Sequence, residues 1–107
     1  NYPGNRFVRL VVPVAVGWAE PGFDLGLVAV AEIEAMVVAI DFVKQFAVER
    51  HPAVVAGLHY WRVALASYLE TAAGWESMSL KDYIQKCCSW LLVNSKDLAG
   101  SVASMLN

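Results

Sequence analysis

The sequence predicts an all-α fold, a compact bundle of three to four helices with an irregular or edge-strand N-terminal arm. Two observations lead to this prediction. From residue 24 onward, apolar residues recur every three to four positions, and Pro, Gly and Asn divide this pattern into segments. The only β-branched-rich segment, near the N-terminus, has no second strand to pair with. At 107 residues the chain is too short for two domains, so we expect one helical domain over residues 1–107.

Residues 6–18, with the sequence RFVRLVVPVAVGW, are the ambiguous part of this arm, which we place at residues 1–22. Pro13 fits poorly in a central strand and in the middle of a helix, because it cannot donate a backbone hydrogen bond. An edge strand, an extended arm and a kinked helix all remain open. A lone strand would need a second chain to pair with, which favours association.

The expected helices span residues 24–50, 52–73, 79–94 and 96–106. Asp24 is the expected N-cap of the first, and Pro52 suits the first position of the second. Ser79, followed three residues later by Asp82, resembles a capping box at the start of the third. Its predicted core stripe is Leu80, Tyr83, Ile84, Cys87, Trp90 and Leu91.

Glu32 is the candidate site residue that the helical pattern singles out. On a helix that begins at Asp24, successive residues are about 100° apart, and six apolar residues then fall within about 40° of Glu32. These residues are Leu25, Val28, Met36, Ala39, Val43 and Phe46. Glu34 and Asp41 fall on the opposite, solvent side. We therefore expect Glu32 on the buried face, where a carboxylate must be paired, hydrogen-bonded or protonated.

Three interpretations of a buried Glu32 stay open. It can be a structural tie to Arg62, His59, a Tyr hydroxyl or a Trp N–H on a neighbouring helix. It can be a polar group that fixes the register of an oligomer interface. It can also be a functional acid or base that lines a cavity.

The composition favours a surface that a protein partner covers. Hydrophobic residues make up 58% of the chain, charged residues 17%, and the mean hydropathy is +0.48. Membrane insertion is not expected, because no uncharged run approaches the 20 or so residues of a spanning helix. Nucleic-acid binding is not expected either, since the net charge is −2 and no basic stripe is present. Between Arg9 and Lys44 lie five acids and no base, which would suit a basic partner surface or form a solvated acidic face.

Cys87 and Cys88 are adjacent and are the chain's only cysteines, so we expect both to be reduced and the protein to work in the cytoplasm or another reducing compartment. Cys87 with His59 is a possible nucleophile pair, but the surrounding sequence offers no oxyanion loop. Two His eight residues apart, with neighbouring Cys, match none of the common zinc patterns. We expect no metal and no cofactor.

The remaining candidates are aromatic and basic side chains. His59 and Arg62 lie one turn apart beside Trp61, an arrangement that suits carboxylate binding or a cation–π contact. Trp18 and Trp75 fall in expected turns, where aromatic side chains can serve as interaction hot spots or cap the bundle ends.

We therefore expect a non-enzymatic helical module for protein–protein interaction or assembly, self-associating or part of a larger protein. Catalytic residues are not assigned. The expected partner-binding residues are Glu32, Met36, Val43, Phe46, His59, Trp61, Arg62, Trp18 and Trp75. The alternative is a small-molecule-binding protein or small enzyme whose inter-helix cavity uses Glu32, His59 and Arg62, with Cys87 as a further catalytic candidate.

Overall fold

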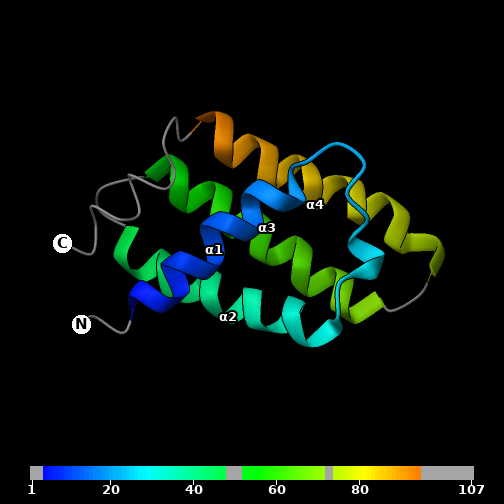
Figure 1. Cartoon of the computed structure of the whole chain (residues 1–107), viewed down its shortest axis with the longest axis horizontal. Helices are drawn as coiled ribbons and strands as arrows, with labels where there is room; N and C mark the ends of the chain where they lie inside the picture. The colour runs from blue at the N-terminus through cyan, green and yellow to red at the C-terminus, as the bar shows by residue number, and fades with distance from the viewer. Residues whose placement is uncertain (1–3, 48–51, 72–73, 95–107) are drawn as a thin grey trace.

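The computed structural model describes residues 4–47, 52–71 and 74–94, and these form four α-helices and one 3₁₀ turn (Figure 1). The elements in chain order are α1 (Gly4–Trp18), η1 (Leu25–Leu27), α2 (Val30–Ala47), α3 (Pro52–Thr71) and α4 (Gly74–Asn94). The main contacts join α1 to α2, α2 to α3, α3 to α4, and α4 back to α1. Chain direction alternates from helix to helix (Figure 1). The predicted all-α bundle is confirmed.

Each helix contributes a stripe of side chains to one shared core. In α3 the stripe includes Val54, Leu58, Trp61 and Leu65, which recur every three or four residues and are all buried. That spacing places side chains on one face of a helix of 3.6 residues per turn. The other helices bury Val11, Ala15 and Trp18 in α1, Ile33, Met36, Ala39, Ile40 and Val43 in α2, and Ile84, Cys87, Cys88 and Leu91 in α4.

The N-terminal segment is a helix, so the expectation of an irregular or edge-strand arm is wrong. Pro13 lies inside α1 and is exposed, while Val11, Ala15 and Trp18 point into the core. The i, i+4, i+7 spacing of these three residues is the helical signal. Burial against neighbouring helices outweighs both the β-branched composition and the missing hydrogen bond at Pro13, because intrinsic propensities are small beside tertiary packing.

The second helix begins six residues later than expected, at Val30 rather than Asp24. Asp24 instead caps the short 3₁₀ turn η1, where its side-chain Oδ1 accepts a hydrogen bond from the Gly26 backbone N–H at 2.9 Å. Gly22, with a φ of +83°, provides the left-handed backbone that the turn before Asp24 needs. Leu25 and Val28 therefore do not share a helix with Glu32.

The last described helix begins five residues earlier than expected, at Gly74, so Ser79 is not its N-cap. The expected helix at 96–106 lies outside the described residues. None of the described helices has the length and hydropathy needed to cross a membrane.

Candidate functional site: the groove between α3 and α4

The expected cluster of Glu32, His59 and Arg62 does not form. Arg62 Nε lies 3.2 Å from Asp41 Oδ2, and Lys44 Nζ lies 3.4 Å from His59 Nδ1. Lys44 also lies 3.8 Å from Asp41 on its own helix. These contacts join α2 and α3 in antiparallel register and use Asp41, which the sequence placed among the ordinary solvent acids. Glu32 precedes Asp41 by nine residues, roughly 13 Å along the helix axis, and so lies far from Arg62.

The expectation that Glu32 is buried is also wrong. Glu32 is exposed in the first turn of α2, whereas its neighbour Ile33 is fully buried. Two features of the fold explain the error. Leu25 and Val28 belong to the preceding turn, so counting them shifted the apparent centre of the apolar face toward Glu32. In addition, residues 29–32 are all exposed, so burial along this helix begins only at Ile33.

Most of the apolar and aromatic candidates belong to the core and are not available to a partner. Met36 and Val43 are buried, as is Trp18, which was expected near the surface and is 6% exposed. Trp18 stacks on Phe23 and meets Trp61 edge-on, each at a ring-centroid distance of 5.8 Å. Trp61 is fully buried, and its indole N–H has no hydrogen-bond partner among the described residues. The side chains of Phe46 and Trp75 lie outside the described part of the chain.

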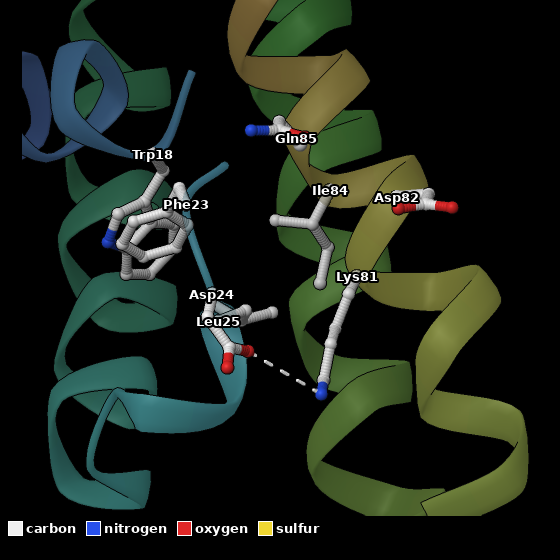
Figure 2. Close-up of a pocket in the computed structure, with 8 residues that line it drawn as sticks. All are labelled: Trp18, Phe23, Asp24, Leu25, Lys81, Asp82, Ile84 and Gln85. Carbon is white, nitrogen blue, oxygen red and sulfur yellow. Dashed lines mark ion pairs between the residues drawn. The ribbon is translucent and has the colours of Figure 1, made fainter. Parts of the chain in front are cut away.

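A cavity of about 280 Å³ lies where the connection between α1 and α2 meets α4 (Figure 2). Its polar groups already hold the connection in place. Lys81 reaches from α4 to Asp24, with 3.7 Å between Nζ and Oδ1, and the Gln85 amide donates to the Glu20 carbonyl oxygen. Because these two contacts tie the connection to α4, and the Asp82 carboxylate points away from the other lining residues (Figure 2), we describe this cavity as a structural junction.

A different arrangement lies between α3 and α4, where a groove of about 330 Å³ is open to solvent. Tyr60 on α3 and Tyr83 and Trp90 on α4 line it, and their side chains are 57%, 46% and 42% exposed. Tyrosine and tryptophan are enriched at the hot spots of protein interfaces. The remaining lining residues are Ala56, Gly57, Lys86 and Cys87.

Gly57 permits the close approach of the two helices that shapes this groove. A Cβ atom placed on Gly57 would overlap the Trp90 ring and the Leu91 side chain. The missing side chain therefore lets the indole lie directly against the α3 backbone. Trp90 is thus held by packing on one side while part of its surface stays open to solvent.

The charge of this region is positive. Among the described residues that line the groove, Lys86 is the only charged one, and no described acid forms an ion pair with it. A second hollow of about 350 Å³ adjoins the groove through Ala56 and Tyr60 and is lined by Lys44 and His59. None of the described residues that line the groove or this hollow is acidic, although Lys44 is paired with Asp41 on its own helix.

The thiols beside the groove are poor nucleophiles. Burial raises the pKa of Cys87, against a smaller lowering by its hydrogen bond with Tyr83. Burial also raises the pKa of Cys88, and the neighbouring Cys87 adds to that shift. Both thiols are therefore protonated near neutral pH. His59 makes its contact with Lys44 on the α2 side of α3, so the structure does not assemble the Cys87–His59 nucleophile pair.

Sequence reasoning missed this groove because it assigned Tyr83 and Trp90 to the core stripe. On a helical wheel both lie about 60–80° from Leu80, at the edge of a stripe that also contains Ile84, Cys87 and Leu91. A stripe that wide exceeds what two neighbouring helices cover. The sequence does contain one signal for the groove. Tyr83 and Trp90 are seven residues apart and so lie on one edge of the helical stripe, and Lys86 lies between them in the sequence.

Comparison with protein-family models, curated proteins and solved structures gives no match for this chain.

Proposed function

We propose that this chain is a helical protein-interaction module that self-associates through the face formed by α3 and α4. The observation that carries the proposal is the group of three exposed aromatic side chains, Tyr60, Tyr83 and Trp90, around one groove. Tyrosine and tryptophan provide large contact areas and lose little conformational freedom when they are covered.

The aliphatic surface next to the groove extends the same face. Val63 lies one turn beyond Tyr60 on α3 and is 44% exposed. Residues three apart on a helix are neighbours on its surface, so Val63 continues the apolar area that Tyr60 begins. An apolar surface of this kind is typical of the centre of an interface, where charged residues are depleted.

The alternative proposal is a small-molecule site built from Glu32, His59 and Arg62. It has little support, because the three side chains do not come together. These side chains occupy different levels of the bundle, and Arg62 is engaged with Asp41. Lys86 is the only charged group among the described residues that line the groove, whereas specific ligand sites use several convergent polar groups.

As part of the same proposal, the module works in a reducing compartment. Both cysteines are free and buried, and burial raises the pKa of both thiols. Thiols of this kind react slowly with oxidants. The proposal predicts that reductant changes neither the fold nor the association.

Light scattering after size exclusion, across a hundredfold range of protein concentration, tests the proposal. We expect a species larger than the monomer whose population rises with concentration. Tyr60→Ser should weaken this association roughly tenfold, because interface hot spots contribute at least 1–2 kcal/mol each. The matched control is Val16→Ser on α1, where the valine is 46% exposed and distant from the groove. A monomer at every concentration, or equal weakening by both variants, would contradict the proposal.

A further inference from the structure

We infer that the groove between α3 and α4 is filled by the outer face of α2 from a second copy of this chain, so that copies join head to tail. This inference rests on the proposed self-association and specifies which surfaces meet. It is carried by the charge and exposure of two different faces of the same molecule.

The outer face of α2 consists of Ala31, Glu34, Ala35 and Val38, all of them exposed. These positions lie opposite the buried stripe that includes Ile33, Met36 and Ile40. Val38 is 59% exposed, and Val30 in the first turn is 61% exposed. This face is therefore apolar with an acid in its middle, and no described cation forms an ion pair with Glu34.

The groove has the complementary properties. Its exposed surface is aromatic, and Lys86 is the only charged residue among the described residues that line it. A helix that presents small and apolar side chains with an acid between them matches a groove with one unpaired cation beside aromatic rings. Complementary charges of this kind favour one partner and one register over others.

The two faces of one chain are too far apart to meet. The helices α2 and α4 lie on opposite edges of the bundle (Figure 1), and each makes its main contacts with α1 and α3. The contact therefore requires a second copy. Because the two surfaces differ, each added copy leaves one groove and one α2 face free, and the assembly grows as a ring or an open chain.

A symmetric contact of groove with groove is the competing arrangement for a second copy. It would place the Lys86 side chains of both copies in the same interface, with no acidic lining residue between them. Like charges brought together across an interface oppose association. The acidic face of α2 removes that repulsion and supplies the missing counter-charge.

Charge reversal at the two faces tests the inference. Glu34→Lys and Lys86→Glu should each weaken self-association about tenfold, since each change replaces an attractive pair with a repulsive one. An equimolar mixture of the two variants should restore it, because each contact between unlike variants again joins opposite charges. Analytical ultracentrifugation of each variant, of the mixture and of the double variant measures these effects. Glu70→Lys, on an exposed position of α3 more than two turns from the groove, controls for net charge.

The outcomes separate this inference from the proposed function. If neutralising the cation by Lys86→Gln strengthens association and Glu34→Lys leaves it unchanged, groove meets groove, and the head-to-tail inference fails while self-association stands. If Glu70→Lys weakens association as much as Glu34→Lys does, net charge alone is responsible and the inference fails. If the unaltered chain is a monomer at every concentration, both the inference and the proposed function fail.

Discussion

The two sides of α3 differ in which side chains lie at the surface beside the helix–helix contact. On the α2 side, Asp41, Lys44, His59 and Arg62 pair with one another at the surface. On the α4 side, aromatic side chains rim an open groove around Gly57. Both contacts are antiparallel, and they share the same central helix.

The comparison shows that titratable groups gathered between helices are not by themselves a functional site. On the α2 side, each charged or imidazole group lies within 4 Å of another group that it can bind. On the α4 side, Lys86 has no ion-pair partner among the described residues, and the aromatic rings keep much of their surface exposed. The exposed aromatic surface, rather than the number of charged groups, distinguishes the groove.

Among the variants that test this comparison, Gly57→Leu should have the largest effect on stability, because it should push α3 away from α4. Even a Cβ at this position overlaps Trp90 and Leu91, so a leucine forces the helices apart. We expect a loss of about 2–3 kcal/mol in the free energy of unfolding, measured by urea denaturation, as for overpacked cores.

Ala53→Leu is the matched control, because Ala53 is exposed one turn earlier on α3. It should change the free energy of unfolding by less than about 0.5 kcal/mol. Similar losses in both variants would show that Gly57 does not set the spacing between α3 and α4.

The next effect is a loss of stability at alkaline pH from the thiols on the α4 side. Burial raises the pKa of Cys88, so the folded state keeps its proton at a pH where the unfolded chain has lost it. The stability that the protonated thiol gives the folded state is complete below the pKa of an unfolded cysteine, about 8.5. It declines as the pH rises from there toward the higher pKa of Cys88 in the folded state. Between pH 7 and 10 the decline should reach about 2 kcal/mol.

Urea denaturation with reductant at both pH values measures this effect. Cys88→Ala removes the titrating group, so its free energy of unfolding should fall less steeply with pH than that of the unaltered chain. Parallel declines would show that Cys88 ionises in the folded state as easily as in the unfolded one.

A smaller effect is expected on the α2 side, from the pair formed by Asp41 and Arg62. Both side chains are partly exposed, so solvent screens the attraction. A double-mutant cycle with Asp41→Asn and Arg62→Met should give a coupling free energy of about 0.2–1 kcal/mol that decreases with added salt. Zero coupling at low salt would show that this contact adds nothing measurable to the packing of α2 on α3.

The helices α2, α3 and α4 and much of their buried stripes follow from sequence periodicity, but α1 and the edges of the stripes do not. Leu58, Trp61 and Leu65 recur at helical spacing, and the structure buries all three. Glu32 and Tyr83 were misplaced for one shared reason: whether a residue at a stripe edge is buried depends on where its helix begins and which helix covers it. Composition also misled at α1, where β-branched residues form a helix because Val11, Ala15 and Trp18 are buried together.

The smallest predicted effect concerns Glu32, which lies outside both contacts of α3. In the first turn of α2 its carboxylate interacts favourably with the helix dipole, so Glu32→Gln should cost about 0.3–0.5 kcal/mol in unfolding free energy. Its effect should add to that of Arg62→Met within about 0.3–0.5 kcal/mol, because the two side chains share no partner. The double-mutant cycle of Asp41 with Arg62 should give a measurable coupling free energy. Comparing the two cycles therefore shows where along α2 the polar contact with Arg62 lies. A Glu32–Arg62 coupling above that of Asp41–Arg62 would move the contact to the start of α2 and overturn the comparison.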